Sequence, residues 1–115
     1  TAEQIALASN ELIENAVSYG SVSGDILFSL VESKRQIEVQ VVNVTSAGRL
    51  SNLKAQLEKI CVDPERVYQE EMGRAVAGTG GRAALGLARI CFEGQMGLMF
   101  DVDGYSVTMC AWCPR

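Results

Sequence analysis

Glu11 and Asn15 lie four residues apart in the stretch ELIENAVSYG, beside Leu12 and Ala16. If this stretch is helical, the two polar side chains project from neighbouring points on one face. Such a pair can hold a hard cation through the amide oxygen and orient a water molecule through the carboxylate. The alternative is a surface carboxylate hydrogen-bonded to a surface amide, and the stretch by itself favours that alternative.

A second chemical pattern is the glycine-rich stretch TGGRAALGLARI at 79–90, which runs into a predicted helix. Such a turn exposes backbone N–H groups and the positive end of a helix dipole, an arrangement that binds anions. It is not a Rossmann fingerprint, because no strand directly precedes it, and it lacks the Gly-Lys-Ser/Thr end of a P-loop. A flexible connector remains the alternative.

Length and charge narrow the class of protein. A chain of 115 residues corresponds to one domain, residues 1–115. The formal charge of -4, with scattered Lys and Arg, argues against nucleic acid or an anionic membrane surface as the partner. No apolar run approaches the roughly 20 residues of a spanning helix. We therefore predict a soluble, cytoplasmic protein.

The chain has no histidine and four cysteines. Without histidine, a Cys/His zinc site and histidine-assisted nucleophilic catalysis within this chain are excluded. The cysteines form one CxxC pair, CAWC at 110–113, which is too little for a four-thiolate zinc site. Thioredoxin-like pairs open a helix, whereas this pair follows the strand-like alternation YSVTM. We predict buried and edge-strand thiols.

Hydrophobic spacing predicts the elements that must position these residues. Residues 3–19 have helical spacing up to Gly20, and 25–33 with 36–44 read as a hairpin. Ser51 is expected to cap a helix carrying Leu53, Leu57 and Ile60. A further helix is predicted after Asp63-Pro64, then a break from Gly78 to Gly81, then a helix over 82–94.

The last predicted element is a hairpin around Asp103-Gly104, a dipeptide expected to supply the positive φ angles of its turn. Adjacent strand pairs separated by helices predict an α+β two-layer sandwich, with a mostly antiparallel sheet covered on one face by helices. The long connection between residues 44 and 85 is expected to act as a lid over a ligand.

The chain carries, in order, ELIENAVSYG, a hairpin ending in VVNV, a helical lid, LGLARI and a closing hairpin. In this order its parts resemble the GHKL (Bergerat) ATPase superfamily. That superfamily includes histidine kinases, gyrase-type ATPases and anti-sigma serine kinases, and the resemblance covers nearly the whole chain. It implies that Asn15 is the Mg²⁺ ligand bridging the triphosphate. It also implies that Glu11 polarises the attacking group or orients its water.

The resemblance is incomplete at two boxes. Asn43 stands where the family has an adenine-reading aspartate, and it is followed by VTSAGR, with Gly48, in place of a glycine pair. Asparagine accepts more weakly than aspartate, which weakens adenine recognition by about 1 kcal/mol or more. Ala84 stands where a GxGLGL box has glycine, while Leu85 and Gly86 match that box. The resemblance implies that Gly80, Gly81, Arg82, Leu85 and Gly86 surround the phosphates.

The resemblance implies an ATP- and Mg²⁺-dependent regulatory domain, nearest in type to an anti-sigma-like serine/threonine protein kinase that acts on a small partner protein. The alternative is a divergent scaffold of the same fold that binds a protein without ATP turnover. Family members usually carry a strand and a helix before the first helix seen here. The chain is therefore either part of a longer protein or completes an open sheet edge with a partner, such as a second copy.

Overall fold

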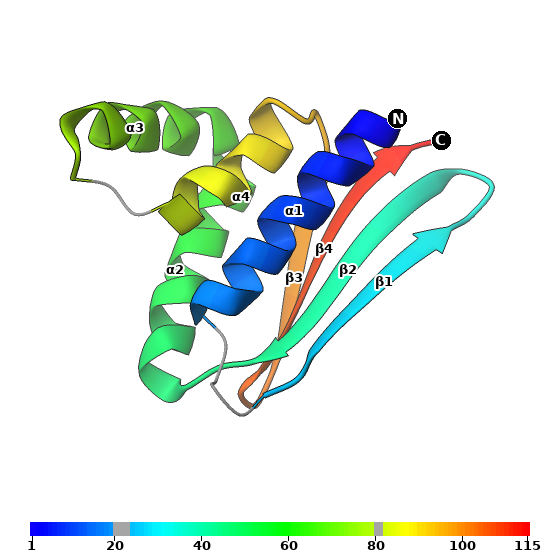
Figure 1. Ribbon diagram of the computed structural model, residues 1–115, viewed down its shortest axis with the longest axis horizontal. Helices are drawn as coiled ribbons and strands as arrows, with labels where there is room; N and C mark the ends of the chain where they lie inside the picture. Colours follow the sequence, from blue (N-terminus) through cyan, green and yellow to red (C-terminus); the bar gives the residue numbers. More distant parts are fainter. Residues whose placement is uncertain (20–23, 80–81) are drawn as a thin grey trace.

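Alternating apolar residues build an antiparallel sheet, and helical repeats build a layer on one of its faces (Figure 1). Residues 1–19, 24–79 and 82–115 are described in this computed structural model. Its strands are β1 (Ile26–Glu32), β2 (Gln36–Val44), β3 (Gly97–Asp103) and β4 (Ser106–Pro114), in the sheet order β1-β2-β4-β3. The predicted α+β two-layer sandwich is confirmed.

The helices are α1 (Ala2–Tyr19), α2 (Ala47–Val62), α3 (Pro64–Ala77) and α4 (Arg82–Phe92). On α1 the residues Ala8, Leu12 and Ala16 recur every four positions and are fully buried, so this stripe faces the core. On β2 the alternate residues Val39 and Val41 are fully buried on the same side. Within the described residues, no helix is both long and apolar enough to cross a membrane.

Helix α2 begins five residues earlier than the sequence predicts. Its N-cap is Ser46, and Ser51 lies inside the helix, so the predicted cap at Ser51 is wrong. The Leu50 N–H donates to the Ser46 carbonyl at 2.8 Å, and Leu50 packs against the core. Packing of Leu50 therefore extends the helix back through residues 47–51.

Helix α3 starts and ends at the predicted signals. The Asp63 carboxylate accepts a hydrogen bond from the Arg66 N–H at 3.2 Å, and Pro64 occupies the first helical position. Gly78 ends the helix in the left-handed conformation, with φ of 74°. The helix packs on α4, where the rings of Tyr68 and Phe92 stack with centroids 4.5 Å apart.

The last hairpin turns at Gly104 and Tyr105, because Asp103 already pairs with Ser106 across the ladder. Gly104 has φ of 61°, whereas Asp103 does not have a positive φ, so only half of the predicted dipeptide supplies that angle. A glycine at the first central position is the preference of a type II′ turn.

The sheet order places β4 between β2 and β3, away from both edges. Cys110 and Cys113 are both buried on this strand. The predicted burial of these thiols is confirmed, and their predicted position on an edge strand is wrong. Strand order depends on pairing between distant segments, which the local alternation of residues 106–114 does not reveal.

The two helix caps allow a matched test. Asp63→Ala removes a side-chain bond to the first turn of α3 and is expected to lower the free energy of unfolding by about 1 kcal/mol. Ser46→Ala is the control, because the Ser46 side chain makes no cap hydrogen bond, and its effect should be much smaller. Urea unfolding followed by circular dichroism measures both. Equal losses would show that the Asp63 cap contributes nothing specific.

Candidate functional site

Glu11 and Asn15 are buried side chains of α1, with 5% and 1% of their surface exposed. They flank the stripe that packs α1 on the sheet, so the helix turns both inward. Polar side chains on the surface would remain solvated, and this pair does not. Their burial excludes the alternative of a surface carboxylate and amide.

The Glu11 carboxylate is held by α4. Arg89 Nη1 lies 3.3 Å from Glu11 Oε1, and Arg89 Nε lies 2.8 Å from Glu93 Oε2. The hydrogen bond to Glu93, together with the charges of Glu93 and Glu11, raises the pKa of the Arg89 guanidinium. Gly86 packs directly on the carboxylate, since a Cβ at that position would overlap Glu11 Oε2. A buried negative charge is thereby paired and enclosed.

The amides of Asn15 and Asn43 are the unusual feature of the interior. Both residues are 1% exposed, and all four of their side-chain nitrogen and oxygen atoms lack a hydrogen-bond partner among the described residues. Each amide offers two donors and one acceptor oxygen, and burying it without partners costs roughly 1–3 kcal/mol. Buried polar groups in proteins are normally paired, so these two amides call for a ligand or an ordered water.

Three neighbouring elements contribute these groups. α1 contacts both β2, which carries Asn43, and α4, which carries Gly86. The C-terminal ends of α1 and β2 lie at the same end of the sandwich (Figure 1). Asn43 continues the buried alternation of Val39 and Val41, so the ladder itself turns its amide toward the helices. The structure therefore brings buried polar side chains from α1 and β2 to adjoining elements, and α4 adds the half-buried Arg89.

The other predicted site residues are placed less specifically. Gly48 lies in the first turn of α2, where an added Cβ would meet nothing within 4 Å, so no close approach requires glycine there. Leu85 is half-buried on α4, and Ala84 is buried, with its methyl group among the apolar interior. Gly80, Gly81 and the side chain of Arg82 lie outside the described residues.

Arg89 is a site residue that sequence reasoning missed. It lies inside the motif LGLARI, one turn beyond Gly86, and its partner Glu11 is 78 residues away in the chain. Spacing along α4 places Arg89 on the same side as Gly86, and that is the one local signal available. The carboxylate that pairs with Arg89 depends on how α4 packs on α1, which local spacing does not reveal.

A magnesium ion is the metal that the chemistry of this region suits best. Among the described residues, no three His, Cys, Asp or Glu side chains converge into a metal-binding group. Mg²⁺ commonly takes only one or two protein oxygen ligands and completes its shell with water and substrate phosphates. The Oδ1 of Asn15, which has no hydrogen-bond partner among the described residues, is an oxygen of the kind that Mg²⁺ takes.

The two cysteines of CAWC lie on opposite faces of the sheet, because Cys113 stands opposite Ile37 and packs in the core with Val39 and Val41. Cys110 pairs in register with Gln40, on the sheet face opposite the buried Val39 and Val41. Its Sγ lies 3.6 Å from Glu38 Oε2, which also accepts from Gln40 Nε2 at 3.2 Å. Burial raises the pKa of the Cys110 thiol to about 11, with the adjacent Glu38 charge adding to the shift. A reactive redox cysteine requires a lowered pKa, so this geometry opposes a redox role.

No protein-family model matches this chain, and no curated protein matches its sequence.

The contact between Gly86 and Glu11 predicts that a methyl group at position 86 destabilises the fold. Gly86→Ala should lower the free energy of unfolding by roughly 1–3 kcal/mol, because the Cβ overlaps an enclosed carboxylate. Gly73→Ala in α3 is the matched control, since its Cβ would meet nothing, and it should stabilise by about 0.5–1 kcal/mol. Chemical denaturation measures both. An unchanged stability for Gly86→Ala would contradict the close packing of Glu11.

The raised pKa of Cys110 predicts slow alkylation. At pH 8 about one thousandth of a thiol with a pKa of about 11 is thiolate, so the rate should climb roughly tenfold per pH unit toward 11. The exposed Cys61 should react with iodoacetamide well before Cys110. Mass mapping of alkylated peptides gives both rates. Rapid alkylation of Cys110 at pH 7 would restore the redox interpretation of CAWC.

Proposed function

We propose that the chain binds Mg²⁺-ATP between α1, β2 and α4 and acts as a regulatory protein kinase, transferring the γ-phosphoryl group to a serine or threonine of a small partner protein. The observation that carries the proposal is the pair of buried amides at Asn15 and Asn43, which find no hydrogen-bond partner within residues 1–19, 24–79 and 82–115. These are the two positions that, in the resemblance to the GHKL superfamily, bind the metal and the adenine.

The energetics of the two amides support a ligand site. A core optimised only for stability would carry apolar side chains at these positions, because each orphan amide costs roughly 1–3 kcal/mol. Polar groups that are costly in the ligand-free chain become favourable once a ligand pairs with them. Asn15 offers an oxygen to a cation, and Asn43 offers a donor and an acceptor to an adenine edge.

The surroundings of Glu11 support a role in transfer. Its carboxylate is enclosed and pairs with Arg89, so one wall of the region holds a fixed negative charge beside a fixed positive one. Phosphoryl transfer relies on positioning and on charge stabilisation more than on covalent chemistry by the protein. In this arrangement Glu11 would orient the attacking hydroxyl group, and a Mg²⁺ held at Asn15 would offset the charge of the phosphates.

A scaffold without ATP turnover is the second candidate, and the burial of the site favours it. Because Asn15 and Asn43 are 1% exposed, a ligand reaches them only after the elements around α1 move apart. A surface hollow of about 590 Å³ lies instead between α2 and α3, lined by residues that include Val62, Arg66 and Val67. A protein segment seated in that hollow would bind without nucleotide.

Thermal unfolding with and without millimolar Mg²⁺-ATP tests nucleotide binding. The wild-type melting temperature should rise, since a ligand at 100 times its dissociation constant adds about 2.7 kcal/mol. Asn15→Ala should abolish the rise while leaving the ligand-free chain as stable as wild type or more stable, because it removes an orphan amide. Leu12→Ala, a fully buried truncation one turn earlier in the chain, should instead cost about 2–5 kcal/mol.

Asn10→Ala provides the second control, because this residue is exposed on α1 and its substitution should keep the full response to nucleotide. No response in the wild-type chain would reject the kinase and leave the scaffold. If the response is present, Glu11→Gln should retain it and lose transfer of labelled phosphate to the partner protein. Retained transfer by that variant would remove Glu11 from the mechanism.

A further inference from the structure

Strand β1 is an apolar edge that nothing in the described part of the chain covers. All seven of its residues are exposed, and its only neighbour among the described strands is β2. Five of them are large hydrophobic residues with 38% to 61% of their surface exposed: Ile26, Leu27, Phe28, Leu30 and Val31. An exposed apolar edge strand offers unpaired backbone groups together with unburied side chains, which is the surface another strand recognises.

The opposite edge of the same sheet is protected. On β3 the exposed positions include Asp101 and Asp103, whose charges oppose pairing with a further strand. On β1 the one charged residue is Glu32, at the end of the strand. The two edges therefore differ in the feature that decides whether an edge can accept a partner.

The partner of β1 must be apolar on both faces. Phe28 and Leu30 stand opposite the buried Val41 and Val39 of β2, so they lie on the helix side of the sheet. Leu27 stands opposite Val42 and therefore lies on the other side. A strand that is apolar on one face only would place polar neighbours beside one of these sets. β1 itself has the required composition.

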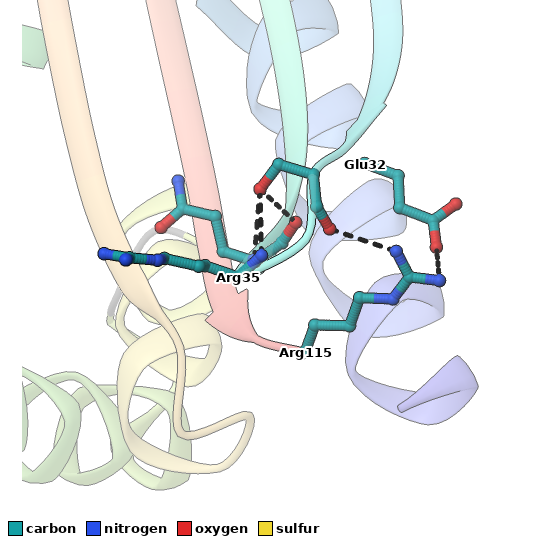
Figure 2. Close-up of polar contacts among 5 residues, drawn as sticks. Glu32, Arg35 and Arg115 are labelled. Carbon is teal, nitrogen blue, oxygen red and sulfur yellow. Dashed lines mark hydrogen bonds and ion pairs between the residues drawn. The ribbon is translucent and has the colours of Figure 1, made fainter.

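The charged end of β1 is already neutralised within the chain. Arg115 pairs with Glu32, and its Nη1 donates to the Ser33 carbonyl at 3.1 Å (Figure 2). The Arg115 N–H also donates to the Arg35 carbonyl at 2.9 Å. These contacts hold the tip of the β1–β2 hairpin in place, so the edge is ordered before a partner arrives.

The hydrogen-bond pattern of the hairpin identifies the free groups of β1. The Ser33 N–H donates to the Gln36 carbonyl at 2.9 Å, which makes this pair a hydrogen-bonded one. Because such pairs alternate along an antiparallel ladder, Val31, Ser29 and Leu27 also bond to β2. The N–H and C=O groups of Ile26, Phe28, Leu30 and Glu32 therefore point to the open edge.

From this pattern we propose that β1 pairs antiparallel with β1 of a second copy of the chain, about a two-fold axis at Ser29. In that register the backbone of Phe28 forms hydrogen bonds with Leu30 of the other copy, and the backbone of Ile26 forms them with Glu32 of the other copy. Leu27 lies opposite Val31 on the other face. Every outward backbone group is then paired, and apolar side chains meet on both faces. The two sheets join into one of eight strands, with an isologous interface.

Paired charge substitutions test the register. Sedimentation over a concentration series should show a wild-type dimer. Leu27→Lys with Val31→Lys places lysines opposite each other twice and should raise the dimer dissociation constant at least roughly tenfold. Leu27→Glu with Val31→Lys places opposite charges there and should restore most of the affinity. The control is Val62→Lys with Val76→Lys, at positions on α2 and α3 that are more exposed than Leu27 and Val31, and it should leave the dimer intact.

A cross-link tests the axis independently. In a Cys61→Ser background, Ser29→Cys should form an intermolecular disulfide in glutathione redox buffer, because non-hydrogen-bonded pairs lie about 4.5 Å apart at Cα. Leu27→Cys, on the same strand, should not link to itself, since its opposite residue is Val31. Any of three results would overturn the proposal. These are a monomer at all concentrations, equal dimer dissociation constants for the two double variants of Leu27 and Val31, or no disulfide at position 29. None of these results depends on nucleotide binding.

Discussion

The interior is organised around the buried carboxylate of Glu11. A charge removed from water must be paired, and Arg89 supplies the pairing charge from α4 at 3.3 Å. The pairing is sterically compatible only because position 86 has no side chain, which lets α4 lie directly on the carboxylate. With α4 fixed against α1, the stacking of Tyr68 on Phe92 then sets where α3 lies. The ion pair thus acts together with the apolar packing of Leu87 and Ile90, which bury α4 in the same core.

Asn15 and Asn43 are different, because no hydrogen bond among the described residues offsets the free-energy cost of burying their amides. Around them the core is apolar, built from residues such as Leu12, Val41 and Val107, all fully buried. Glu11 has its partner, whereas neither amide has one in the part of the chain that the structure describes. A protein core rarely keeps such groups without a reason in function, since apolar substitution at these positions would be stabilising. The contrast separates a polar group that is paired within the fold from two that are the basis of the proposed ligand site.

Local patterns predict the elements, and distant contacts decide the rest. The four-residue repeat of α1, the strand alternation of β2 and the Asp63-Pro64 start of α3 all act within a few residues, and each is confirmed. The start of α2 was missed because Leu50 is held by the core. Arg89 was missed for the same kind of reason, since its acid lies on another helix. The central position of β4 depends on pairing with β2 and β3, which no local spacing encodes.

The open edge and the candidate site are physically connected. Ile26 of β1 stands opposite Asn43 of β2, so the end of the exposed strand supports the residue that carries one of the orphan amides. A strand added to β1 would pair the backbone of Ile26 and restrict the β1–β2 hairpin at that end. Restricting an element before a ligand binds lowers the ordering entropy that binding must overcome. Pairing at the edge would then favour ligand binding beside Asn43, although the partner strand never contacts the ligand.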